Sequence, residues 1–199
     1  MILKIIQTGD KVLRKKAKKL SLSQLNSSET QQLIDLMIAT LRDRPGVGLA
    51  APQVGESLQI IIIEDKKEYQ EKVSKELLEA QIRIPVSLKI IINPVLHIID
   101  EGDDNLFFEG CLSIDGYAAI VSRANKVKVS GLNREGEKIS FVAEGWLARI
   151  LQHEVNHLNG SLYVDKMLPQ TFITDKHYAD TWMKAHPIKL TEFIIESQK

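Results

Sequence analysis

Three residues in the second half of the chain have the types and spacing needed for metal-assisted hydrolysis. His153, Glu154 and His157 form the pattern HEVNH. On an α-helix, histidines four residues apart lie on one face, so both imidazoles can bind the same metal ion. A glutamate next to the first histidine reaches a water on that metal rather than the metal itself. The pattern therefore predicts a metal site with an adjacent general base.

A helical wheel of residues 146–159 supports this interpretation. At about 100° per residue, His153 and His157 lie about 40° apart, on the same face as Trp146 and Ile150. Glu154 falls on the buried side, where an unpartnered carboxylate is unstable and a metal with its water would stabilise it. Two ordinary core histidines are the alternative explanation. We expect the polar stripe of this helix to consist of Arg149, Gln152, Asn156 and Asn159.

A catalytic metal site needs a third protein ligand and an open position for water. In one group of HExxH proteases the pattern continues as xxGxxH; here the glycine is Gly160, but Tyr163 stands in the last position. Another group uses a glutamate farther downstream, and no glutamate lies between His157 and Glu192. The remaining strong ligand is Cys111, the only cysteine in the chain. A single cysteine also excludes a disulfide framework and a four-cysteine zinc site.

The composition excludes several other classes of protein. The 199 residues fit one domain, and 26 Lys and Arg balance 26 Asp and Glu, so the net charge indicates neither a nucleic-acid nor a membrane-surface partner. No apolar run approaches the ~18 residues of a membrane span. The N-terminus shows no secretory signal and no clear transit peptide. We expect a cytoplasmic bacterial protein, with a processed mitochondrial or other organellar protein as the alternative.

The elements that must position these residues can be read from the hydrophobic pattern. A helix capped by Ser28 is expected to end at 44–46, and a second helix over 145–159 ends at Gly160. Buried strands are expected over 58–64 and 88–99, with an interruption at Pro94 and then a polar turn over 100–105. Further strands are expected over 118–121, 126–130 and 138–142, with a hairpin turn at 133–136.

Two further segments are expected in addition to these helices and strands. The charged segment 65–81 lacks a strong apolar face and predicts an exposed, partly helical insertion. The tail, 167–199, is expected to be strand or coil and then helix, with breaks at Pro169 and Pro187. Residues 1–199 are thus expected to form a single catalytic domain with these two additions.

Three stretches together resemble the ordered motifs of peptide deformylases: GVGLAAPQ (46–53), EGCLS (109–113) and HEVNH (153–157). The resemblance covers roughly residues 3–166, and residues 145–154 together with the tail through 184 are similar to the mitochondrial-type branch. It implies an α+β fold, with mixed or antiparallel sheets packed around the central HExxH helix. It also implies hydrolysis of the N-formyl group from the N-terminal methionine of new polypeptides, with release of formate.

The resemblance, together with the residue chemistry, implies a role for each motif. Cys111, His153 and His157 hold one divalent metal, with Fe²⁺ as the native ion and Zn²⁺, Ni²⁺ or Co²⁺ as alternatives that suit the same ligands. Glu154 takes the proton of the water. The oxyanion is bound by the side-chain amide of Gln53 and the backbone N–H of Leu112.

The substrate-binding residues form a second implied set. The expected substrates are N-formylmethionyl peptides and nascent chains, with the ribosome as a further candidate partner and no direct nucleic-acid or membrane binding. Gly48, like Gly46, is interpreted as a position where substrate backbone passes close by. The methionine pocket is assigned to Val47, Trp146 and Ile150, with core packing as the alternative. Glu109 is expected to order the motif loop, and the set is completed by Gly110.

One residue departs from the family pattern, which usually reads HExDH. Asn156 stands in place of the aspartate. Its side chain has the shape of aspartate but not the negative charge that would be expected to interact with Arg123 or Arg149. A low-activity or inactive deformylase-like metal-binding protein is therefore one alternative. The other is an HExxH zinc endopeptidase, against which the missing downstream ligand argues.

Overall fold

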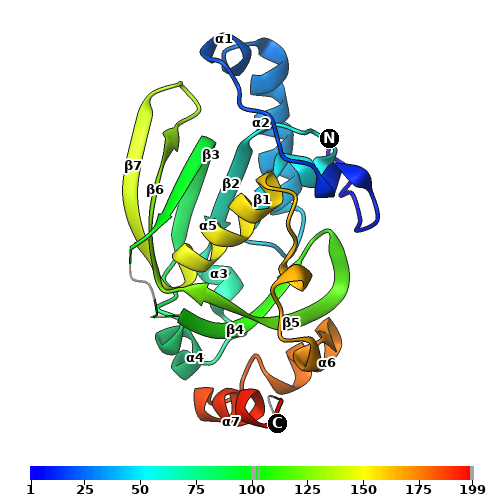
Figure 1. The fold of residues 1–199 in the computed structure, drawn as a ribbon, viewed down its shortest axis with the longest axis vertical. Helices are drawn as coiled ribbons and strands as arrows, with labels where there is room; N and C mark the ends of the chain where they lie inside the picture. Colours follow the sequence, from blue (N-terminus) through cyan, green and yellow to red (C-terminus); the bar gives the residue numbers. More distant parts are fainter. Residues whose placement is uncertain (100–101, 103, 198–199) are drawn as a thin grey trace.

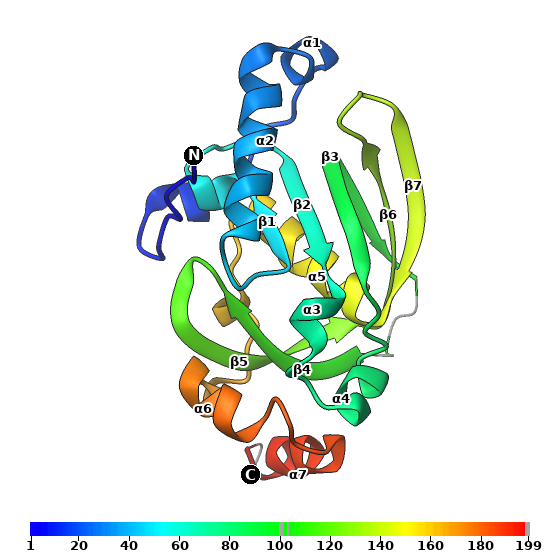
Figure 2. The same cartoon turned by 180° about the vertical axis from the view of Figure 1, so that it is seen from behind.

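The computed structural model describes residues 1–99, 102 and 104–197. Two antiparallel sheets meet on the central helix α5 (Gly145–Leu158), which contacts strands of both (Figures 1 and 2). The α+β fold with antiparallel sheets around this helix is confirmed. The five-stranded sheet has the order β1 (Gly48–Ala50), β2 (Ile60–Asp65), β3 (Val86–Ile98), β6 (Lys126–Leu132) and β7 (Lys138–Glu144). The three-stranded sheet has the order β4 (Asp104–Cys111), β5 (Ile114–Ala124) and β8 (Ile173–Thr174).

The other helices lie around these sheets. The α-helices are α1 (Leu22–Leu25), α2 (Ser28–Arg42), α3 (Lys67–Gln70), α4 (Lys75–Ala80), α6 (Asp175–Thr181) and α7 (Pro187–Ser197). The 3₁₀ helices are η1 (Lys11–Arg14), η2 (Ala51–Val54), η3 (Tyr163–Asp165) and η4 (Pro169–Thr171). None of the described helices has the length and apolar character needed to cross a membrane.

Strand β2 is buried on both faces because a helix packs on each. Ile61 and Ile63 belong to the hydrophobic cluster that contains Ile150 of α5. Ile60 and Ile62 belong to the cluster that contains the apolar face of α2. Alternate side chains of a strand point to opposite faces, so the unbroken isoleucine run holds α5 and α2 on the two sides of one strand.

Most of the predicted elements are present, with shifted ends. The N-cap of α2 is Ser27, whose side chain accepts a hydrogen bond from Thr30 N, and not Ser28 as expected. The two halves of the strand around Pro94 form one continuous strand, β3, with a register shift beside Asn93, whose φ is 52°. The hairpin between β6 and β7 and the end of α5 lie where the sequence predicts them.

The strands β1 and β4 were not predicted. β1 has three residues and is held by its pairing with β2, so it lacks the length needed for a periodic pattern. β4 reads DNLFFEGC, without regular alternation, and its pairing with β5 supplies the order. The polar turn expected over 100–105 falls largely outside the described residues, and Asp104 and Asn105 already belong to β4. Both unpredicted strands carry residues of the motifs.

Helix α4 of the segment 65–81 lies beside the tail at one end of the molecule (Figure 1). The segment forms α3 and α4, but it is exposed only in part. Its buried side chains are Asp65, Gln70, Leu77 and Gln81. Leu77 of α4 joins Leu190 and Ile194 of α7 in a cluster that also includes Phe108 of β4. This apolar contact, and not a charged surface, decides where α4 lies.

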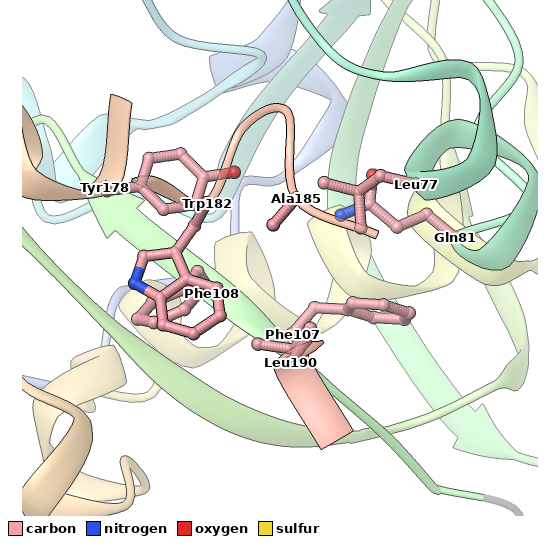
Figure 3. A pocket seen from close by; sticks show the side chains of 8 residues that line it. All are labelled: Leu77, Gln81, Phe107, Phe108, Tyr178, Trp182, Ala185 and Leu190. Carbon is pink, nitrogen blue, oxygen red and sulfur yellow. The ribbon is translucent and has the colours of Figure 1, made fainter. Parts of the chain in front are cut away.

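Phe108 is the centre of an aromatic group between β4 and the tail. Its ring lies 5.3 Å from the ring of Tyr178, 5.7 Å from that of Trp182 and 6.3 Å from that of Phe193. A small pocket, shown in Figure 3, opens between these rings and α4. Since Phe108 directly precedes Glu109, the tail packs on the strand that carries the EGCLS motif.

Replacing Trp182 by alanine should destabilise the protein. We expect the free energy of unfolding to fall by about 2–4 kcal/mol, because the change removes an aromatic side chain that packs on both Phe108 and Phe193. Urea unfolding followed by circular dichroism measures this. Ile188→Ala is the control, since Ile188 on α7 is 61% exposed and its loss should change the free energy by less than about 0.5 kcal/mol. Equal effects of the two changes would contradict this account of the tail.

Candidate metal centre and active site

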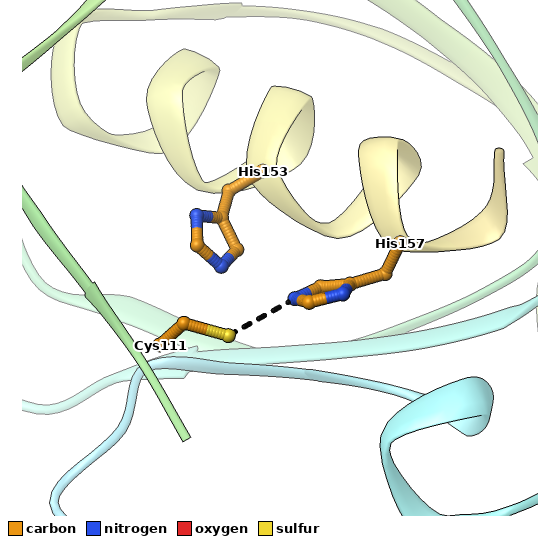
Figure 4. Close-up of side chains that lie close together, drawn as sticks. All are labelled: Cys111, His153 and His157. Carbon is orange, nitrogen blue, oxygen red and sulfur yellow. Dashed lines mark hydrogen bonds between the residues drawn. The ribbon is translucent and has the colours of Figure 1, made fainter. Parts of the chain in front are cut away.

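The structure brings Cys111, His153 and His157 together. Cys111 ends β4, and the two histidines project from successive turns of α5 (Figure 4). Their possible ligand atoms all lie within 4.8 Å of one another. The Cys111 Sγ is 3.3 Å from His157 Nε2, and the two imidazole rings are 5.0 Å apart. These are the three residues that the sequence proposes as ligands, although they come from distant parts of the chain.

The chemistry of this group fits a divalent transition metal. One thiol and two imidazoles suit zinc, iron, nickel or cobalt better than the oxygen-seeking ions magnesium and calcium. The site is largely shielded from solvent, because His157 is 1% exposed and the His153 side chain 11% exposed. Three protein ligands leave the further coordination position that distinguishes a catalytic site from a structural one.

The protonation of the two histidines differs in the absence of a metal. Burial lowers the pKa of His157 well below its usual value. Burial also disfavours protonation of His153, but hydrogen bonds to Cys111 and Glu109 outweigh it and raise the pKa of His153 to about 10. His153 therefore favours its protonated form and His157 its neutral form. A metal cation bound by these three groups would replace the proton of His153, as ligand binding by thiolate and neutral imidazole requires.

Glu109 contacts the ring nitrogen of His153 that does not face the other two proposed ligands. Its Oε2 lies 2.9 Å from His153 Nδ1, which fixes the ring so that Nε2 faces Cys111 and His157. A carboxylate behind a ligating histidine orients the ring and strengthens it as a ligand. The expected role of Glu109 in ordering the motif thus has a definite geometry, since one carboxylate links β4 to α5.

Two buried arginines compensate the Glu109 charge. Arg123 of β5 donates two hydrogen bonds to the carboxylate, at 2.9 and 2.8 Å, and Arg149 of α5 donates one at 2.7 Å. Arg149 also donates to the backbone carbonyls of Asn105 and Val121. Hydrogen bonds from Arg123 and His153 outweigh the effect of burial and hold the pKa of Glu109 well below its usual value.

The buried position of Arg149 corrects the expected polar stripe of α5. Arg149 is 3% exposed, because its guanidinium finds the Glu109 carboxylate and strand carbonyls inside the protein. The sequence contained a signal for this placement: Arg149 and His153 are four residues apart and so share a helix face. The helical wheel groups Arg149 with the polar residues because it contains no information about the Glu109 carboxylate of β4, which pairs with Arg149 inside the protein.

Asn156 does not make the connection expected of the family aspartate. Its Nδ2 is buried and has no hydrogen-bond partner among the described residues. Both candidate arginines, Arg123 and Arg149, direct their hydrogen bonds to Glu109 and to backbone carbonyls instead. Among the described residues, both arginines are thus hydrogen-bonded to Glu109, and neither is hydrogen-bonded to Asn156.

Glu154 lies beside the metal-ligand group with few polar contacts. It is 3% exposed, and its Oε2 has no hydrogen-bond partner among the described residues. Burial raises the pKa of Glu154 to about 7. A carboxyl group with such a pKa can both accept and return a proton near neutral pH, as the sequence-based role of Glu154 requires.

Gln53 presents its amide N–H groups to the same place. Its Oε1 accepts a hydrogen bond of 2.8 Å from Ala50 N, which fixes the orientation of the amide. Its Nε2 lies 3.3 Å from Ser113 Oγ and 3.5 Å from Cys111 Sγ. The side chain is 1% exposed. Ala50 and Ser113, which sequence reasoning missed, thus orient the predicted oxyanion donor.

Four of the remaining predicted residues have their contacts with Gln7, Arg83 or the core. Leu112 follows Cys111, and its carbonyl accepts a hydrogen bond of 2.9 Å from Gln7 Nε2. The three residues assigned to the methionine pocket all contact one core cluster: Val47, Trp146 and Ile150. The Trp146 ring is also covered by Arg83, whose guanidinium carbon lies 4.7 Å from the ring centre. Core packing accounts for these contacts as fully as a substrate pocket does.

Fold and site together define a metalloprotein built on an HExxH helix, and comparisons with known proteins specify its family. The family model for polypeptide deformylase matches residues 2–172. The chain is 49% identical to the Arabidopsis thaliana chloroplastic/mitochondrial peptide deformylase 1A over 85% of this chain and 63% of that protein. It is 41% identical to the Halothermothrix orenii peptide deformylase over 84% and 94% of the two chains. The chain belongs to the polypeptide deformylase family.

Solved structures agree with this assignment. A class I type b peptide deformylase from Acinetobacter baumannii, with Met-Ala-Ser bound, superposes with a TM-score of 0.73 at 35% identity. That match covers 84% of this chain and 99% of the other. The match with the plant relative is less complete, because the chain spans under two thirds of that relative's length.

Removing the charge of Glu109 should weaken metal binding. In Glu109→Gln, we expect the affinity for zinc to fall by about 10–100-fold, because His153 loses the carboxylate that orients it. Competition with a chromophoric chelator measures this affinity. Glu144→Gln is the matched control, since Glu144 precedes the same helix but its side chain is 49% exposed. Unchanged zinc affinity in folded Glu109→Gln would show that Glu109 does not support the ligand.

Proposed function

We propose that this protein is a metal-dependent hydrolase that removes the N-formyl group from the N-terminal methionine of newly made polypeptides and releases formate. The observation that carries this proposal is the convergence of Cys111, His153 and His157 in a member of the deformylase family. Glu154 and Gln53 lie in the same region as proton carrier and hydrogen-bond donor.

The metal ligands in this proposal are Cys111, His153 and His157. A divalent metal held there would supply a Lewis acid that lowers the pKa of a coordinated water from ~16 towards ~7. We favour Fe²⁺ as the native ion from the family resemblance, and the thiol and imidazoles also suit Zn²⁺, Ni²⁺ or Co²⁺.

Glu154 moves the protons of the reaction. Its carboxylate takes a proton from the attacking water and later delivers it to the nitrogen of the leaving amine. Both transfers are possible for one group because burial places the pKa of Glu154 near 7. The proton needs no other carrier.

The oxyanion that forms on the formyl oxygen needs fixed donors. We assign this role to the Nε2–H of Gln53 and the backbone N–H of Leu112, which flank Cys111. One such donor contributes about 3–4 kcal/mol to stabilisation of the transition state. The hydrogen bond from Ala50 N keeps the Gln53 amide in place before the substrate arrives, so no reorganisation is needed during the reaction.

The substrates are formyl-Met peptides and nascent chains, with the ribosome as a further candidate partner. The A. baumannii relative with Met-Ala-Ser bound supports a methionyl peptide as ligand. In this proposal Val47, Trp146 and Ile150 surround the methionine side chain, and Gly110 flanks the peptide. Formylated chains occur where protein synthesis starts with formylmethionine. The compartment is therefore a bacterial cytoplasm or an organelle, and the name of the A. thaliana relative supports the organelle.

Two other functions use the same site. A zinc endopeptidase would share the Glu154 chemistry but cleave internal peptide bonds. An inactive metal-binding relative is suggested by Asn156, whose buried Nδ2 has no hydrogen-bond partner in the part of the chain that the structure describes. Neither is favoured by the placement of Cys111 with the two histidines next to a buried carboxyl group.

The direct test is hydrolysis of a formylated tripeptide. Protein loaded anaerobically with iron or nickel should release formate and free amine from formyl-Met-Ala-Ser. The acetylated peptide should react more slowly, since one extra methyl group near the metal is disfavoured by about 1–3 kcal/mol. No formate from the formyl peptide would refute the proposal, and cleavage inside an unformylated peptide would favour the endopeptidase.

Two substitutions separate metal binding from proton transfer. Cys111→Ser should lose activity together with bound metal, because the soft thiolate ligand is gone. Glu154→Gln should keep the metal and lose about 10²–10⁴-fold in kcat, because the amide cannot accept the proton. Metal content is measured by mass spectrometry alongside kcat. Full activity of Cys111→Ser would contradict the ligand assignment.

A further inference from the structure

Gly48 lies directly beside the carboxyl group of Glu154. A methyl group built on the Gly48 backbone would lie 2.2 Å from Oε1, 2.7 Å from Cδ and 2.9 Å from Cγ of Glu154. Side-chain Cβ atoms essentially never have contacts below 3.0 Å. The Glu154 carboxyl group therefore occupies the space that any side chain at position 48 would fill.

Neither partner can easily move away. Gly48 belongs to β1, whose three residues pair in register with β2. The next two residues of β1, Leu49 and Ala50, are fully buried. Glu154 is 3% exposed on the central helix. Space at this contact exists only because residue 48 has no side chain.

Hydrogen bonds do not explain the position of the carboxyl group. Glu154 Oε2 has no partner among the described residues, in contrast to Glu109, which has three. The location of the Glu154 carboxyl group is instead set by the shape of its surroundings. At Gly48 that shape leaves no room for a Cβ atom.

We propose that Gly48 is a positioning residue for the proposed proton carrier: its missing side chain leaves the space in which the Glu154 carboxyl group must lie. This inference rests on the proposed function, and it gives Gly48 a role different from the substrate contact expected from the sequence. Gly46, in the same motif, has another neighbour, because a methyl group there would meet the Leu112 side chain at 3.1 Å. The two glycines of GVG are thus not equivalent.

A displacement of the carboxyl group should reduce turnover more than substrate binding. A general base must lie within about 2.6–3.2 Å of the proton that it takes, and a misplacement of about 1 Å can cost 10²-fold in rate. In Gly48→Ala, the contact between the methyl group and Glu154 Oε1 must lengthen from 2.2 Å to at least 3.0 Å, so the carboxyl group is expected to move by nearly this amount. The substrate backbone, if it passed Gly48, would instead lose affinity.

The first experiment is a thermal-stability cycle on nickel-loaded protein. Gly48→Ala should lower Tm by about 2–12 °C, because the methyl group overpacks a filled site. In a Glu154→Ala background, the same methyl group enters vacated space, so Tm should change by less than about 2 °C or rise. The non-additivity measures the contact between the two residues without any substrate. An equal loss of Tm in both backgrounds would overturn the proposal.

The second experiment compares kcat and KM with formyl-Met-Ala-Ser. Gly48→Ala should lose at least about 100-fold in kcat, with KM changed less than about threefold and metal content unchanged. A raised KM with normal kcat would overturn the proposal in favour of a substrate contact. If Gly48→Ala alone does not fold, folding of the double variant with Glu154→Ala supports the proposal, and failure of both overturns it. An inactive wild-type protein would refute the proposed function, while the Tm cycle would still decide the role of Gly48.

Discussion

The burial of one carboxylate, that of Glu109, is the constraint on which the rest of the site depends. A buried charge is stable only with partners that compensate it, and here they come from β5, as Arg123, and from α5, as Arg149 and His153. The network therefore joins the small sheet to the central helix. Since Cys111 is two residues beyond Glu109 on β4, the same network determines how close the thiol lies to the two histidines.

The larger sheet supplies the other half of the site. Its edge strand β1 carries Gly48 against Glu154, and η2 follows at once with Gln53. This edge is held by β2, whose isoleucines pack on α5 on one face and on α2 on the other. The metal-ligand group thus lies where both sheets meet one helix, and each of the three sequence motifs reaches it from a different element.

The sequence predicted the elements and residues whose patterns are local. The HExxH helix has a strong helical period, the isoleucine strand is an unbroken β-branched run, and the hairpin has a turn signal between two strands. HEVNH with Cys111 indicated the ligands. The sequence did not predict β1 and β4, because their order comes from pairing with distant strands rather than from propensity. It also placed Arg149 in solvent, because its compensation by Glu109 is a tertiary contact. The close approach of Gly48 to Glu154 joins residues far apart in the chain and leaves no local pattern.

The attachment of the N-terminal segment has a consequence for the order of events during synthesis. Thr8 N donates to the carbonyl of Ser113, and Ala17 N donates to that of Leu158 at the end of α5. Thr8 and Ala17 are thus synthesised well before their partners in the EGCLS loop and in the last turn of the HExxH helix. Contacts of such long sequence separation form late. Until α5 has been synthesised, the chain therefore lacks both the candidate metal-ligand group and the partner of Ala17, so neither contact can form.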